Sequence, residues 1–321
     1  MKKLIIALSA LGAAFTATAK ADIAVSGSSN VAYVSTAGTG DNEEVLVGST
    51  VAFSMSTTTA SGMGISAGMT MSQDYDAAGA GGGVVTGGQA VTFSTGGATI
   101  VVGDVEISDT TGSVGGVVNG PLDDASDLDT SVAGSFSDDD GLGVELTTAV
   151  GTASLNISYV SNHTVDNYGV LNSSTAGDDS AMSASISVPM SGYTVTLGVA
   201  DSDTGESSAG ASVSGAIGGG TVTVGYSNQT LIAAHADLTT AGDSEQVGAT
   251  YSMSLDADTT IALGYISRKD ADSESDTKTE LSVERALGGG ATVYLDLVNL
   301  TGDTAANADG TAIAFGTSVS F

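Results

Sequence analysis

The chain carries nine carboxylates between residues 105 and 141, and their type and density make this segment the strongest candidate for a chemical function in the sequence. They are Glu106, Asp109, Asp123, Asp124, Asp127, Asp129, Asp138, Asp139 and Asp140. Carboxylates held in a narrow passage with low-dielectric walls concentrate cations and repel anions. The group is therefore either a cation-attracting site or the solvated surface of a connecting segment.

A second acidic group alternates along the chain at Asp270, Asp272, Glu274 and Asp276. Hard carboxylate oxygens suit calcium, but Ser275 stands where a helix-loop-helix calcium loop needs glycine, and no helix is expected to flank it. We therefore expect no cofactor. Calcium bound by the acids of segment 105–141 is the alternative.

Catalysis finds little support in the sequence. His163 and His235 are the two histidines, and both fall in or beside expected connections. A serine nucleophile needs a base within hydrogen-bond reach, and serines are too abundant for the sequence to exclude such a pair. No Gly-x-Ser-x-Gly elbow is placed on a strand-to-helix turn. We therefore expect that the protein is not an enzyme. A barrel with hydrolytic activity is the alternative.

The charge balance and the first residues define the setting of these groups. The net charge of −30 repels nucleic acid. Lys2 and Lys3 precede an apolar run and a small-residue stretch that ends at Ala21, which predicts a secretory signal peptide over 1–21, cleaved before Asp22. Four basic residues then remain, Arg268, Lys269, Lys278 and Arg285. The chain has no cysteine, so no disulfide is expected to stabilise it.

The elements that must position the acids are β-strands. Apolar and small polar residues alternate with a period of two in segments 51–55, 155–159, 193–199, 222–226, 261–265, 281–283 and 293–297. The connections between such segments are alternately short and long. Longer polar connections separate the short links, which lie near 57–62, 96–97, 151, 189–192, 218–220, 255–258 and 287–290. About sixteen strands with tight turns at one rim and long loops at the other are typical of a transmembrane barrel.

We therefore predict an all-β fold, a closed antiparallel transmembrane barrel over residues 22–321. Lipid offers no hydrogen-bond partner, so a sheet in a membrane must close. Val, Leu, Ile and Tyr would face lipid, and Ser, Thr, Gly and Asn would face a lumen too wide for side chains to fill. The alternative is a secreted structural or adhesive β-protein, but the sequence has no repeat of constant length.

The final strand ends on Phe321, with Ile313, Phe315 and Val319 on the same face. This end resembles the last strand of bacterial outer-membrane proteins, whose final aromatic is the signal for the barrel-assembly machinery. The stretches 51–56, 61–64, 97–104 and 287–293 are also similar in order and spacing to the sixteen-stranded general diffusion porins, particularly their alphaproteobacterial branch. The resemblance covers nearly the whole chain after residue 21.

The resemblance implies a homotrimeric outer-membrane channel for ions and small hydrophilic solutes, exported through the periplasm and embedded among lipopolysaccharide. It also implies that the third external connection, here 105–141, folds inward as the constriction loop. We expect Asp123, Asp124, Asp127 and Asp129 at the narrowest point, with Glu106 and Asp109 in the same loop. The channel should favour cations, and calcium could bridge acids to lipopolysaccharide.

The chain departs from the family at the barrel wall. The family commonly opposes the loop acids with wall arginines, yet no Lys or Arg lies between Asp22 and Ser267. We expect Arg268 and Lys269 at the outer rim, where lipid phosphates lie, and Arg285 at the inner rim. Lys278 shares its face with Ser282 and should point into the lumen.

Overall fold

A computed structural model describes residues 22–38, 42–73, 85–105, 114–118, 122, 141–161, 180–203, 205, 207–231, 242–269, 275–302 and 310–321. The signal peptide expected over 1–21 lies outside these residues, and its cleavage stays a prediction. The first strand begins at Asp22. No helix in the described part of the chain is long and apolar enough to cross a membrane.

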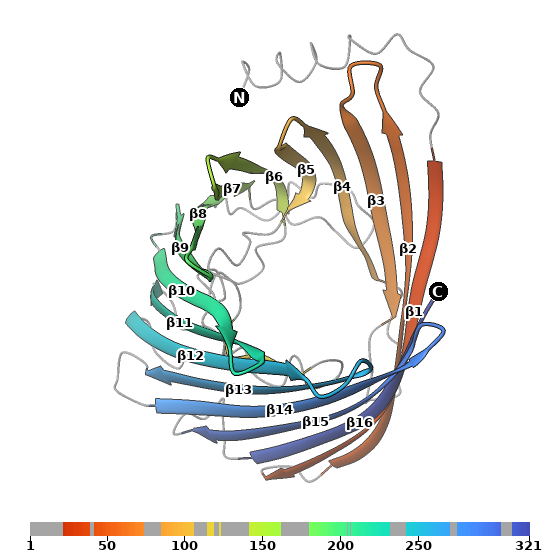
Figure 1. Cartoon of the computed structure of the whole chain (residues 1–321), viewed down its shortest axis with the longest axis vertical. Helices are drawn as coiled ribbons and strands as arrows, with labels where there is room; N and C mark the ends of the chain where they lie inside the picture. Colours follow the sequence, from red (N-terminus) through yellow and green to blue (C-terminus); the bar gives the residue numbers. More distant parts are fainter. Residues whose placement is uncertain are drawn as a thin grey trace.

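Sixteen antiparallel strands form one closed barrel, which confirms the predicted fold class (Figure 1). Each strand pairs with its neighbours in sequence, and β1 pairs with β16 to close the ring. The strands are β1 (Asp22–Gly38), β2 (Asn42–Thr58), β3 (Gly64–Gln73), β4 (Val85–Thr95), β5 (Ala98–Val105), β6 (Gly141–Val150), β7 (Ala153–Ser161), β8 (Ser180–Met190), β9 (Tyr193–Ser202), β10 (Ser207–Ile217), β11 (Gly220–Leu231), β12 (Gly242–Ser254), β13 (Thr259–Lys269), β14 (Ser275–Gly288), β15 (Ala291–Gly302) and β16 (Gly310–Ser320).

Tight turns join the strands at one rim, as the alternation of connection lengths predicts. Between β8 and β9, Ser191 and Gly192 have φ values of 50° and 90°, the left-handed pair that a two-residue hairpin turn requires. Both ends of the barrel sequence meet at this rim, where Gly27 and Phe321 exchange two backbone hydrogen bonds of 3.1 and 3.0 Å. The longer connections link strands at the opposite rim, where the connections from β1 to β2 and from β9 to β10 are short as well.

Burial alternates with a period of two along strands such as β12 to β15. On β13, Leu263 and Tyr265 face outward and are exposed, while Gly264, Ile266 and Arg268 face inward and are buried. The outer surface therefore carries the apolar side chains that a hydrocarbon environment favours. The inner face differs from the prediction of Ser, Thr, Gly and Asn alone, because Val34, Ile266 and other apolar residues also point inward.

Candidate functional site in the barrel lumen

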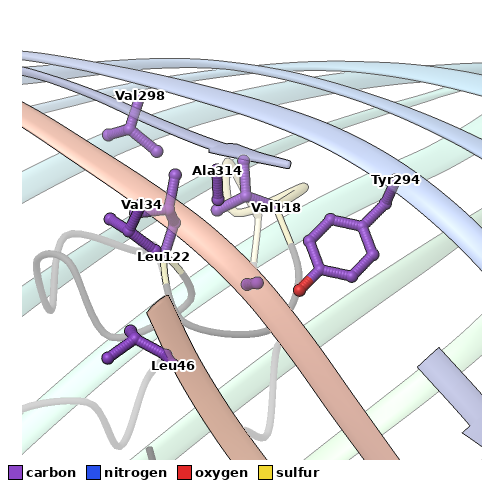
Figure 2. Packing of buried hydrophobic residues seen from close by; sticks show 8 residues of the cluster. Val34, Leu46, Val118, Leu122, Tyr294, Val298 and Ala314 are labelled. Carbon is purple, nitrogen blue, oxygen red and sulfur yellow. The ribbon is translucent and has the colours of Figure 1, made fainter. Parts of the chain in front are cut away.

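Part of the connection between β5 and β6 lies inside the barrel. We call residues 114–118 the inner segment. Val118 packs, together with Leu122, against Val34, Leu46, Tyr294, Val298 and Ala314 on the inner face of β1, β2, β15 and β16 (Figure 2). Of these strands, β15 and β16 lie on the far side of the ring from β5 and β6 in Figure 1, whereas β1 and β2 lie nearer to β5. The inner segment therefore contacts parts of the wall that are distant from the two strands between which it lies in the sequence.

The apolar contact anchors the inner segment. Val118 and Leu122 are 5% and 2% exposed, and the wall residues beneath them are equally buried. Burial of one such side chain stabilises a protein by about 1.5–3 kcal/mol. Without the segment, Val34, Leu46 and Val298 would face water, so the apolar patch of the inner wall is explained by its partner in the lumen.

A carboxylate of the wall holds the backbone of the same segment. Glu280 Oε2 accepts hydrogen bonds from the backbone N–H groups of Val117 and Val118, the second at 3.3 Å. Lys278 Nζ lies 2.7 Å from the other carboxylate oxygen, and both side chains are almost fully buried. The charge of Glu280 is therefore balanced by Lys278 while it bonds the segment. This confirms that Lys278 faces the lumen.

The backbone of the inner segment also lies directly on the wall at β13. A side chain added at Gly264 would place its Cβ 2.0 Å from the carbonyl oxygen of Gly115, so only glycine fits at position 264. Gly115 itself has a φ of 123°, and a Cβ there would lie 2.0 Å from Ile266 Cγ1. A tight backbone approach of this kind requires glycine on both surfaces.

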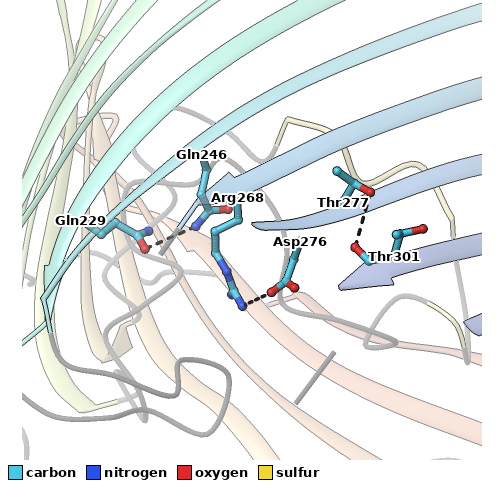
Figure 3. Close-up of polar contacts among 6 residues, drawn as sticks. All are labelled: Gln229, Gln246, Arg268, Asp276, Thr277 and Thr301. Atoms are coloured by element: carbon cyan, nitrogen blue, oxygen red, sulfur yellow. Dashed lines mark hydrogen bonds and ion pairs between the residues drawn. The ribbon is translucent and has the colours of Figure 1, made fainter. Parts of the chain in front are cut away.

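Arg268 corrects one prediction. We expected it at the outer rim facing lipid phosphate, but it points inward, 2.9 Å from Asp276 Oδ2, with the two side chains 4% and 1% exposed (Figure 3). The reason is that β13 continues without a break to Lys269, so Arg268 keeps the inward parity of Gly264 and Ile266. Gln246 donates a hydrogen bond of 3.4 Å to Gln229 nearby (Figure 3).

Carboxylates occupy other inward positions of the wall. Glu145 on β6 accepts hydrogen bonds from Asn156 Nδ2 at 2.7 Å and from Thr147 Oγ1 at 3.2 Å. Glu44, Glu284 and Asp296 also lie at inward positions, as their strand partners show. The inward cations of the described residues, Arg268 and Lys278, both pair with carboxylates. The described wall is therefore predominantly anionic.

Arg285 lies at the inner rim, as expected, and the structure adds an ion pair with Asp256 there. Its Nη1 donates to Thr259 Oγ1 at 2.6 Å and lies 3.4 Å from Asp256 Oδ2. Asp256 lies in the turn between β12 and β13, where the backbone N–H of Asp258, the hydroxyl of Thr259 and the charge of Arg285 hold the pKa of its carboxyl below the ordinary value. Asp256 therefore keeps its negative charge to lower pH than an ordinary aspartate.

All six predicted pore residues lie outside the described residues, namely Glu106, Asp109, Asp123, Asp124, Asp127 and Asp129. Their position in the eyelet stays a prediction. Phe321 is described: it ends the chain beside Gly27 with 77% of its surface exposed. The acids considered for calcium at 270–274 lie outside as well, and within the described ranges no three metal-ligating side chains come together.

Sequence comparison assigns the chain to a family. A family model described as Gram-negative porin matches residues 7–305, and the chain belongs to that family. No curated protein sequence matches it. The family and the closed sixteen-stranded barrel together define an outer-membrane diffusion channel, which is not an enzyme, and they confirm the expected resemblance to the porins.

Solved porin structures share this fold at low sequence identity. OmpF of Salmonella typhi, in complex with daunomycin, is 11% identical with a TM-score of 0.69, covering 93% of this chain and 97% of its own. A mutant of the Rhodopseudomonas blastica porin is 16% identical with a TM-score of 0.61, covering 94% and 100%. An anion-selective porin from Comamonas acidovorans is 12% identical with a TM-score of 0.64, also covering 94% and 100%. The barrel fold by itself therefore does not decide ion preference.

Proposed function

We propose that this porin forms a channel that favours cations. The observation that carries the proposal is the pairing of both inward cations of the described residues: Arg268 and Lys278 are buried and bonded to Asp276 and Glu280. Glu145 faces the lumen without a described cation beside it. Fixed negative charge along a narrow passage raises the local concentration of cations.

The acids of the third connection would add to this charge. Leu122 is anchored to the wall inside the barrel, and Asp123 and Asp124 follow it directly in sequence. Consecutive Cα atoms are about 3.8 Å apart, so the anchor supports a lumenal position for these two acids. We propose that they narrow the pore together with Asp127 and Asp129, and that Glu106 and Asp109 line its approach.

The test is the reversal potential of the reconstituted protein in a planar bilayer under a potassium chloride gradient. The native channel should show a reversal potential of the sign that cation preference gives. Replacement of Asp123, Asp124, Asp127 and Asp129 by asparagine should move this potential toward zero. A control variant with Asp243→Asn and Glu245→Gln, on the lipid-facing side of β12, should change it far less. Anion preference in the native channel would contradict the proposal.

We further propose a homotrimer in which each subunit carries its own pore, exported by residues 1–21 and inserted among lipopolysaccharide after the assembly machinery binds Phe321. The exposed apolar exterior and the terminal aromatic support this view. Deletion of Phe321 should lower the amount of heat-modifiable protein in the outer membrane while the unfolded precursor accumulates. Unchanged insertion of the deletion variant would contradict the role of Phe321.

A further inference from the structure

We propose that four wall residues, Gly264, Ile266, Lys278 and Glu280, form a seat that fixes the inner segment and thereby sets the width of the pore. The inference goes beyond ion preference, because it concerns the position of the segment and not its charge. It assigns these side chains as positioning residues of the channel.

The seat follows one row across neighbouring strands. Gly264 on β13 is the register partner of Glu280 on β14, which in turn pairs with Val298 on β15. The inner segment meets this row in order: Gly115 lies on Gly264, the backbone of 117–118 bonds Glu280, and Val118 packs in the cluster of Val298. The segment therefore lies across these three strands and contacts each of them.

The two ends of the seat act in opposite directions. Glu280 pulls the segment to the wall through two backbone hydrogen bonds, and bonds to an ionised acceptor are among the stronger ones in proteins. Gly264 permits the close approach because it has no side chain, and the atom that a Cβ would meet belongs to the backbone of Gly115. A missing Glu280 should release the segment from the wall, whereas a methyl group at position 264 should push it toward the pore axis.

Lys278 keeps this arrangement stable in a site that excludes water. The carboxylate of Glu280 would be costly to bury alone, and the ammonium 2.7 Å away balances it. Removal of Glu280 by itself would leave Lys278 buried without this partner. A variant with Lys278→Met and Glu280→Met removes the two backbone hydrogen bonds without leaving either charge, and it is therefore the cleaner test.

The experiment compares single-channel conductance among these variants in planar bilayers. The Lys278→Met, Glu280→Met variant should show altered conductance with more rapid current fluctuations, because the segment moves away from the wall more often. Gly264→Ala should show a lower and steady conductance, because the segment is held nearer the axis. Two matched controls, Thr279→Ala on the lipid-facing side of β14 and Gly68→Ala at an inward glycine where a Cβ meets nothing closer than 3.5 Å, should behave as the native protein.

A cross-link gives a second measurement that does not depend on the buried charges. The chain has no cysteine, so Val117→Cys and Glu280→Cys, made together with Lys278→Met so that no charge is left buried, introduce the sole thiols. Joined by a short thiol-reactive linker, this variant should be as quiet as the native channel, and the unlinked protein should fluctuate like the double methionine variant. The proposal would be overturned if the double methionine variant and the unlinked cysteine variant both had the conductance and noise of the native channel while their barrels remained heat-modifiable. The proposal would also be overturned if the linked and the unlinked protein showed the same low current noise.

Discussion

At the residue scale, buried charges on the inner wall are balanced by neighbouring charges of opposite sign. The pair of Arg268 and Asp276 joins β13 to β14, and the pair of Lys278 and Glu280 lies on β14, where Glu280 also bonds the inner segment. Buried pairs of this kind add little over an apolar replacement, but the loss of one partner is costly. Their clearest consequence is that both inward cations of the described wall are balanced by carboxylates.

Asp276→Ala should therefore lower the free energy of unfolding by about 3 kcal/mol, the cost of breaking a buried ion pair from one side. The midpoint of denaturant unfolding in detergent micelles measures this. Arg268→Met combined with Asp276→Leu should recover most of the loss, since no charge is left buried. Thr277→Ala, one residue away on the lipid-facing side, is the control. Equal losses in the single and double variants would show that the ion pair is not the cause.

At the element scale, the strands and turns were largely predictable because their signals are local. The expected links at 189–192 and 255–258 coincide with the turns after β8 and β12, and the connection expected over 105–141 begins where β5 ends and stops where β6 begins. Arg268 was misplaced because the long connection was expected to start beside it, whereas the strand continues past it. The position of a residue along the strand, odd or even, decides which face of the sheet its side chain occupies. When the end of the strand is uncertain, this assignment is uncertain as well.

The inner segment and its seat were not predictable in the same way. Ile266 and Val298 interrupt the polar face of their strands, but their partners at 114–122 are more than 140 residues away in the sequence. Local periodicity carries no information on such a contact. A useful signal was present nonetheless: apolar residues at inward positions of two strands, and an apolar stretch at 114–118 inside an acidic connection.

The seam between β1 and β16 offers a prediction at this scale. A Cβ at Gly27 would lie 2.7 Å from the ring of Phe321, and the backbones of the two residues are hydrogen-bonded. Gly27→Ala should displace the ring and lower the temperature at which the barrel unfolds on a denaturing gel. Phe321→Ala should lower this temperature less in the Gly27→Ala variant than in the native protein, because the two sites share one contact. Fully additive losses would contradict the coupling.

At the scale of the whole molecule, the barrel combines an apolar exterior with a lumen that holds residues 114–118 and 122 of the connection between β5 and β6. Closure satisfies the backbone hydrogen bonds that lipid cannot. A barrel of sixteen strands is too wide for its wall side chains to fill, which agrees with the diffusion channel of the porin family. The segment is fixed to one side of this space, which makes the fold compatible with a permanently open channel of reduced width.

The most direct test of this account is the conductance of the purified native protein in a planar bilayer. We expect stepwise increases in current, each step growing in proportion to salt concentration as it does for ions in bulk water. A bilayer that takes up heat-modifiable barrels and yet shows no steps at any salt concentration would contradict a water-filled passage.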